Sequence, residues 1–335
     1  MKRIVWNALK SFRCVAGQCT DSCCKDWAVD VDTNTAQHYL ALDGALGARL
    51  RQVLKQDDGQ YYMELEQGRC PMWRKDGLCQ IQSELGHDAL CQVCRDYPRL
   101  YMDFGDFQEW GLELSCPEAA RLLLQDMDAE TLCFDGNEEA EYDAECMAVL
   151  KRSQAEMLSF LRSSPLPVNE LLAVLLLYAH GVQGEIDGGY TYTFHAEDCL
   201  AEAKKYAGTP NACSLIEFFK SLEILTDRWT EKLKNLPANY EICMQQEQML
   251  RNLIAYFVRR YWLQAVWDYD LVCRVKFILA ACILIMGMGH DVLSNAQLFS
   301  KEIENDPDNR NAILDAAYVN PAFTDKNLLG LLLNF

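Results

Sequence analysis

The chain is short of basic residues. Its 335 residues include 31 lysines and arginines against 49 aspartates and glutamates, which gives a formal net charge of -18 at pH 7. Proteins hold nucleic acid mainly through lysine and arginine side chains that neutralise phosphates. The charge balance therefore argues against a nucleic-acid partner. It is compatible with a basic or lysine-bearing protein substrate, although most acidic proteins are simply soluble.

The sequence also lacks an apolar run long enough to cross a membrane. The longest run, Phe277 to Met286, is flanked by Arg274, Lys276 and His290. A membrane-spanning helix needs about 20 apolar residues, so we expect a buried helix here. The opening stretch, MKRIVWNALKSFRC, has no apolar core of a secretory signal. We therefore expect a cytoplasmic protein without a transmembrane segment.

Several common catalytic motifs are missing. There is no G-x-S-x-G elbow, no P-loop and no H-E-x-x-H zinc motif. Gly287-Met288-Gly289 lacks the third glycine of a dinucleotide fingerprint and follows an expected helix, not a strand. The aromatic and basic stretch from Tyr256 to Trp267 could face a substrate, but such a stripe is more often core with arginines at its edge.

Cysteine, in contrast, is abundant. Of 16 cysteines, nine lie between Cys14 and Cys116, and the other seven are spread singly over the rest of the chain. Cytoplasmic thiols are kept reduced, so metal or redox use is favoured over disulfides. The seven scattered cysteines mostly sit in apolar helical contexts, where free cysteine behaves as a small hydrophobic residue.

The spacing of the nine cysteines suggests a metal site. Thiolates suit zinc or an iron–sulfur cluster. Only Cys91 and Cys94 have the C-x2-C form of a structural zinc site, and His38 and His87 are the only histidines in this part. The irregular all-thiolate set therefore favours iron–sulfur over zinc. Adjacent Cys23 and Cys24 are expected to point in different directions and so not to serve one iron. The candidate ligands are Cys14, Cys19, Cys23, Cys24, Cys70, Cys79, Cys91, Cys94 and Cys116.

Local patterns predict the fold class. WAVDVD, Trp27 to Asp32, alternates like a strand and ends in a helix cap, and Cys116-Pro117 opens another helix. Residues 126–145 hold nine acidic residues and no basic one, as a solvated connector would. Beyond them, Met147, Leu150, Met157 and Leu161 share one helical face. Asn169 is expected to cap the next helix, which stops at Gly181.

The chain is thus expected to be mainly α-helical. Residues 1–125 would form a cysteine-rich metal-binding module with little strand. Residues 126–145 would form the acidic connector, and residues 146–335 an all-helical domain.

Three segments together resemble a known family. They are FRCVAGQCTDSCCKDWAVDVD, RCPMWRKDGLCQIQSELGHDALCQVCRDYPRL and ELSCPEAARLLL, in that order from Phe12 to Leu124. They resemble the flagellin lysine-N-methylase family of bacteria. The resemblance implies a methyltransferase that uses S-adenosylmethionine, acts on lysine side chains of flagellin and needs a [4Fe-4S] cluster held by the cysteine-rich part. Eight of the nine cysteines match family positions, and Cys91 adjoins them.

The same resemblance bears on the chemistry. Radical S-adenosylmethionine enzymes commonly use C-x3-C-x2-C in a β/α barrel, whereas here Cys23 is followed directly by Cys24 and no barrel pattern appears. Polar and radical transfer therefore both stay open. A polar transfer needs a neutral lysine amine, and lysine has a pKa near 10.4, so a base is required. The candidate bases are Asp96, Asp103 and Glu113.

Arg95, Tyr97 and Arg99 match the family motif CRDYPR and are candidates for binding the methyl donor, whose carboxylate an arginine could hold. The alternative to an enzyme is a non-catalytic zinc or iron–sulfur module that presents helices to a protein partner.

Overall fold

The computed structural model describes residues 2–134, 140–188, 190–236 and 244–333. This part of the chain is mainly helical, as expected. No described helix combines the length and the apolar character that crossing a membrane requires.

Two small sheets are built from the cysteine-rich part, with one strand, β7, supplied by the segment that follows it. The first has the order β5-β6-β1-β7, with β1 parallel to β6 and antiparallel to β7. The second is antiparallel, with the order β2-β4-β3. The strands are β1 (Lys2–Trp6), β2 (Val29–Val31), β3 (Leu54–Asp57), β4 (Gln60–Met63), β5 (Arg99–Asp103), β6 (Phe107–Leu112) and β7 (Ala129–Cys133).

Among the described residues, β1 to β6 fall within residues 1–125 and β7 falls in the expected connector, so the first part carries more strand than expected. Each strand has only three to six residues. An alternating pattern of that length is too short to stand out in a sequence.

Short helices connect these strands. Asp32 caps α2 by accepting a hydrogen bond from the Thr35 backbone N–H at 3.0 Å, and Pro117 is the first residue of α6, so both predicted helix starts are confirmed. The helices are α1 (Asn7–Ser11), α2 (Thr33–Ala41), α3 (Gly44–Val53), α4 (Gln80–Leu85), α5 (Gln92–Asp96) and α6 (Pro117–Leu123).

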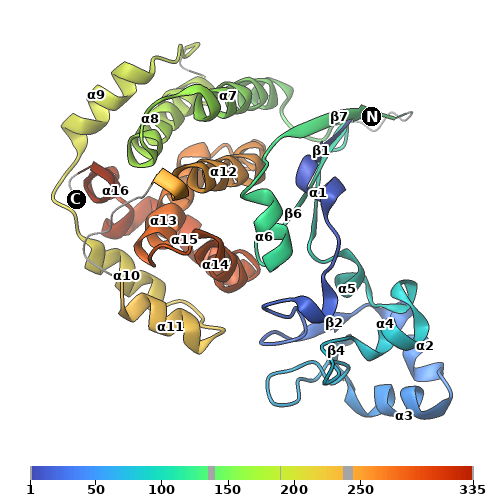
Figure 1. Ribbon diagram of the computed structural model, residues 1–335. Helices are drawn as coiled ribbons and strands as arrows, with labels where there is room; N and C mark the ends of the chain where they lie inside the picture. Colours follow the sequence, from blue (N-terminus) through green and yellow to red (C-terminus); the bar gives the residue numbers. More distant parts are fainter. Residues whose placement is uncertain (1, 135–139, 189, 237–243, 334–335) are drawn as a thin grey trace.

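The rest of the chain is a helical assembly around α13. Nearly every residue of α13 is buried, which matches the long apolar run, and Figure 1 shows the other helices surrounding it. The helices are α7 (Ala144–Ser163), α8 (Val168–Ile186), α9 (Ala196–Tyr206), α10 (Ala212–Lys220), α11 (Asp227–Lys234), α12 (Met244–Tyr261), α13 (Leu271–Gly287), α14 (Val292–Phe299), α15 (Pro307–Val319) and α16 (Asp325–Leu333), with a π-helical turn at Ser300–Glu304.

Two details of α8 differ from expectation. Asn169 does not cap it, because Pro167 is the N-cap residue and the Asn169 amide donates to the Leu332 carbonyl at 3.1 Å. The helix also continues past Gly181 to Ile186. A Cβ at Gly181 would lie 2.3 Å from the ring of Tyr192, so this glycine makes room for packing and does not end the helix.

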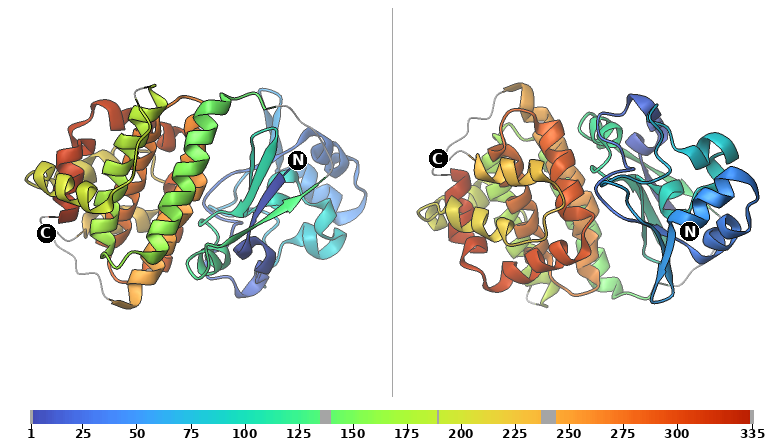
Figure 2. Two further views of the ribbon diagram at one scale, coloured as in Figure 1. Left: turned by 90° about the horizontal axis from the view of Figure 1, so that it is seen from above. Right: turned by 90° about the horizontal axis from the view of Figure 1, so that it is seen from below.

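The buried residues form two cores. The large core joins the β5-β6-β1-β7 sheet and α6 to the helical assembly, and it includes Trp6, Leu123 and Phe257. The small core, whose members run from Val29 to Cys91, is formed by the β2-β4-β3 sheet together with α2, α3 and α4. Figure 2 shows the helical assembly and the sheet-bearing part side by side.

The segment expected to be an acidic connector is partly a strand. β7 lies within residues 126–145 and pairs with β1, while residues 135–139 of this segment fall outside the described residues. The predicted boundaries at residues 125 and 146 stay a prediction.

Candidate functional site

The nine clustered cysteines come from turns and helix starts. Cys14, Cys19, Cys23 and Cys24 lie in the connection between α1 and β2, and Cys70 and Cys79 lie in the connection between β4 and α4. Cys91 and Cys116 are the N-cap residues of α5 and α6, and Cys94 lies within α5. Segments that are distant in the sequence therefore carry their thiols toward one region.

Four thiols gather at the small core: Cys24, Cys70, Cys79 and Cys91. The backbone fixes part of this arrangement, because the Cys70 N–H donates to the Cys24 carbonyl at 2.7 Å and Cys79 pairs with Trp73 in a β-bridge. Burial, together with the charges of the other three thiols, raises the pKa of the Cys70 thiol to about 12.

A second group lies toward the large core and consists of Cys14, Cys19, Cys23 and Cys116. Cys116 is buried, whereas Cys14 and Cys23 are exposed. Burial raises the pKa of the Cys116 thiol to about 11, and the charges of Cys19 and Cys14 act in the same direction. The charge of Cys116 in turn raises the pKa of Cys23, so the four thiols lie close enough to influence one another's pKa.

The two groups meet at two pairs of interacting thiols. The chain turns at Cys23 and Cys24, and the expectation that they do not serve one iron stays a prediction. The interaction between these two thiols lowers the pKa of Cys24 to about 7 and raises that of Cys23. Cys91 and Cys94 form a similar pair, and Cys94 also feels the charges of Cys23 and Cys24.

The thiols fit an iron–sulfur cluster in kind and number. Such clusters are held by cysteine thiolates, each bound to a different iron. Among the described residues, no group of three or more histidine, cysteine, aspartate and glutamate side chains is arranged to hold a metal ion. The thiols are thus gathered without forming a finished ligand shell. The nine candidate ligands and the cluster stay predictions.

The three candidate donor-binding residues of the CRDYPR motif, Arg95, Tyr97 and Arg99, lie close to this region but have different surroundings. The Tyr97 hydroxyl accepts a hydrogen bond from Ser115 at 3.2 Å, and its ring meets Trp27 edge-on at 5.8 Å. Burial and the charges of Cys116 and Cys23 raise its pKa well above the usual value. Tyr97 therefore lies beside the second group of thiols.

The two arginines of the motif have local partners. Arg95 donates to the Asp88 carbonyl at 3.2 Å, and Arg99 donates to the Arg95 carbonyl at 3.1 Å. Arg99 also lies over the ring of Phe12 at 5.8 Å. A role in holding the methyl donor stays a prediction for both.

The three candidate bases are not brought together. Asp103 lies at the β5–β6 turn, where it accepts from the Gly105 N–H at 2.9 Å. Asp96 accepts from the Gln92 amide at 2.5 Å at the end of α5. Glu113 is largely buried, and its carboxylate lies 3.5 Å from the guanidinium of Arg260 on α12. Burial raises the pKa of Glu113, although Arg260 partly offsets this.

The sequence analysis missed the polar residues that tie the cysteine turn to the helical assembly. Lys301, in the π-helical turn, is only 2% exposed, and its ammonium lies 3.2 Å from Asp21 and 2.7 Å from Asp26. Gln297 on α14 donates to Asp21 and to the Ser115 carbonyl, both at 2.8 Å. Gln297 and Lys301 stand among other polar residues in the sequence, so no local signal marks them, and Asp26 lies 275 residues from Lys301.

Known proteins resemble part of this chain. A flagellar biosynthetic protein, FliU of Salmonella muenchen, is 33% identical over 128 residues, which is 36% of this chain and 76% of that protein. Two lysine-N-methylases, from Salmonella typhimurium and Salmonella choleraesuis, are each 32% identical over 128 residues. The chain belongs to the family of FliU and lysine-N-methylase. The motif-based resemblance is thereby confirmed at the level of the family.

The match to the lysine-N-methylase family is partial in length. The alignment covers only 32% of each of the two lysine-N-methylases, or about a third of their length. No family model matches the chain, and no solved structure matches it.

Proposed function

We propose that this protein is a protein-lysine N-methyltransferase of the cytoplasm that uses S-adenosylmethionine and acts on flagellin. The name lysine-N-methylase, carried by two relatives, is the observation on which the proposal rests. The flagellar name of the third relative supports flagellin as the protein substrate. The net charge of -18 suits a lysine-bearing partner and does not favour nucleic acid.

A polar version of the reaction sets clear demands. The bond between sulfur and methyl carbon breaks, a bond between the lysine nitrogen and that carbon forms, and the sulfonium leaves as a neutral thioether. The lysine must first lose a proton, because only its neutral amine can attack. A carboxylate with a raised pKa can accept that proton at neutral pH.

Glu113 meets this demand better than Asp96 or Asp103. It is largely buried, its pKa is raised, and its charge acts on Tyr97 beside the thiols. Asp103 is engaged at an exposed turn and Asp96 at the end of α5. We therefore propose Glu113 as the first candidate for the base. Arg95, Tyr97 and Arg99 remain our candidates for the donor.

The proposal includes a [4Fe-4S] cluster held by thiols of the nine-cysteine set. The gathering of thiols from turns far apart in sequence supports it. When bound, such a cluster supplies a redox-active iron centre. Tyr97 and Trp27 would lie next to it and limit the access of water, because both rings pack beside the second group of thiols.

The test uses the full chain purified without oxygen. We expect a brown protein with about four irons per chain, as one [4Fe-4S] cluster requires. Incubated with S-adenosylmethionine and flagellin, it should add methyl groups to flagellin, detected as a rise in flagellin mass. Glu113→Gln should slow this transfer while iron content stays unchanged. Colourless protein that contains zinc would contradict the cluster. Iron-loaded protein that leaves flagellin unchanged would instead favour a non-catalytic interaction module.

A further inference from the structure

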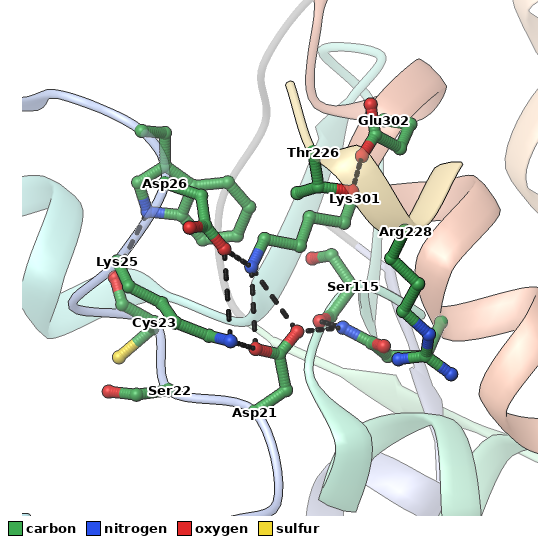
Figure 3. Close-up of polar contacts among 12 residues, drawn as sticks. Asp21, Ser22, Cys23, Lys25, Asp26, Ser115, Thr226, Arg228, Lys301 and Glu302 are labelled. Carbon is green, nitrogen blue, oxygen red and sulfur yellow. Dashed lines mark hydrogen bonds and ion pairs between the residues drawn. The ribbon is translucent and has the colours of Figure 1, made fainter. Parts of the chain in front are cut away.

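Lys301 reaches from the helical assembly into the turn that carries four cysteines. Its ammonium lies between the carboxylates of Asp21 and Asp26, as Figure 3 shows, at 3.2 and 2.7 Å. It also lies 5.0 Å from the ring centre of Trp27. Asp21 and Asp26 stand on either side of Cys23 and Cys24 in the sequence. One buried cation therefore holds both ends of the Cys23–Cys24 turn.

Gln297 connects the same turn to the backbone next to Cys116. Its amide nitrogen donates to Asp21 and also to the carbonyl of Ser115, both at 2.8 Å. Ser115 directly precedes Cys116. A single stretch of the helical assembly, Gln297 to Lys301, is thus bonded to the backbone beside Cys116 and to the turn that bears Cys23.

The π-helical turn explains how Lys301 comes to point this way. Residues Ser300–Glu304 are all buried. The charged side chains of Lys301, Glu302 and Glu304 each contact a different part of the protein. Lys301 meets Asp21 and Asp26, Glu302 accepts from the Leu225 N–H at 2.8 Å, and Glu304 lies 3.2 Å from Arg260. π-helical turns often occur at functional sites.

Stability alone is a poor explanation for this arrangement. Lys301 is almost fully removed from water and Asp21 largely so, which is costly, and a well-packed apolar replacement often stabilises a fold equally well or better. What a buried ion pair does supply is a defined geometry between the segments it joins. Here those segments carry Cys23, Cys24 and Cys116.

We propose that Lys301 and Gln297 are positioning residues that hold the Cys23–Cys24 turn and Cys116 in place for metal binding. This inference rests on the proposed iron–sulfur function for the identity of the metal. It assigns to the helical assembly a part in building the site, which the cysteine motifs alone do not reveal.

The test replaces Lys301→Met in the full chain, with Lys276→Met as the matched control. Lys276 is also a largely buried lysine in an ion pair, 3.0 Å from Asp325, but both residues belong to the helical assembly. Both variants are reconstituted anaerobically with ferrous iron and sulfide. We expect Lys301→Met to bind iron about 10-fold to 100-fold more weakly, as is typical when an outer-shell partner of a metal site is lost. Lys276→Met should bind iron as the parent does.

A second readout does not depend on iron. Hydrogen exchange of the peptide spanning residues 19–27, measured in iron-loaded and iron-depleted chains, should be at least about tenfold faster in Lys301→Met, because the turn opens more often. Lys301→Arg keeps the charge and should restore most of the protection and the electron paramagnetic resonance spectrum of the reduced cluster. Unchanged exchange and iron binding in Lys301→Met would overturn the proposal.

The design separates this proposal from the proposed function. If the parent binds no iron but Lys301→Met still speeds hydrogen exchange of the turn, the metal assignment fails. The claim that Lys301 fixes the turn is then still supported. If the parent binds iron and Lys301→Met matches it in both readouts, only the positioning role fails. Should Lys301→Met not fold, Asp26→Asn removes one carboxylate at a more exposed position, and the same increase in exchange is expected.

Discussion

Glu109 is a charged residue placed where water does not reach. It is 1% exposed in the middle of β6. Its carboxylate accepts a hydrogen bond from the Trp6 indole at 2.6 Å and lies 3.6 Å from Arg259. Burial raises the pKa of Glu109, and these two partners offset only part of the rise. This residue therefore couples folding to pH.

The direction of that coupling can be tested with Glu109→Gln. A carboxyl with a raised pKa binds its proton more tightly in the folded chain. The tighter proton binding contributes fully to stability below the pKa of the unfolded chain, which is about 4.3. This contribution is lost as pH rises through the raised pKa of the folded chain. Urea unfolding of both proteins between pH 4 and 8 should show the parent losing stability relative to Glu109→Gln as pH rises. A difference that stays constant with pH would refute this.

Residues with local signals were predictable, and residues with distant partners were not. Asp32 as a helix cap follows from its neighbours, whereas the thiol ligand set stays a prediction. The contact between Lys301 and Asp26 joins positions 275 residues apart, so no local pattern encodes it. The burial of Glu113 and its contact with Arg260 likewise depend on the tertiary fold.

Among the elements, long helices were predictable and short strands were not. The apolar face of α7 and the burial of the long apolar run in α13 agree with the sequence pattern because each helix spans several turns. The strands of three to six residues carry no such signal. Gly181 misled the prediction of α8, since glycine is usual at helix ends but serves here to admit the Tyr192 ring.

The two glycines of α8 make a matched pair of tests. Gly181→Ala would place a Cβ 2.3 Å from the Tyr192 ring, whereas the nearest atom to a Cβ at Gly184 is the Tyr190 hydroxyl at 3.4 Å. We expect Gly181→Ala to lower the free energy of unfolding by about 1–3 kcal/mol through overpacking. Gly184→Ala should be neutral or stabilising by up to about 1 kcal/mol through helix propensity. Equal effects in urea unfolding would contradict the role assigned to Tyr192.

At the scale of the whole molecule, the cysteine-rich part is divided between two cores. Its strands β1, β5 and β6 share the large core with the helices, and the residues from β2 to the start of α5 form the small core. A division drawn from cysteine density along the sequence could not anticipate this. In the sequence, β1 precedes and β7 follows the residues of the small core. In the structure both strands belong to the larger sheet and contribute nothing to the small core.

The small core should open before the large one. It contains far fewer apolar side chains, two of its members are thiols with two more packed against it, and buried apolar area is the main source of stability. Hydrogen exchange should therefore be at least about tenfold faster for the slowest amides of α2 and α3 than for those of α13. Removing iron should widen the gap, because metal binding stabilises the segments that supply the ligands. Amides of α2 as slow as those of α13 would contradict the division into two cores.

The central claim is that this chain transfers methyl groups to lysine. The most direct measurement incubates the iron-loaded full chain with flagellin and S-adenosylmethionine that carries a deuterated methyl group, followed by peptide mass spectrometry. The account predicts deuterated methyl on lysine side-chain nitrogens of flagellin, and none on flagellin whose lysines were acetylated beforehand. Iron-loaded protein that leaves every flagellin lysine unlabelled would contradict it.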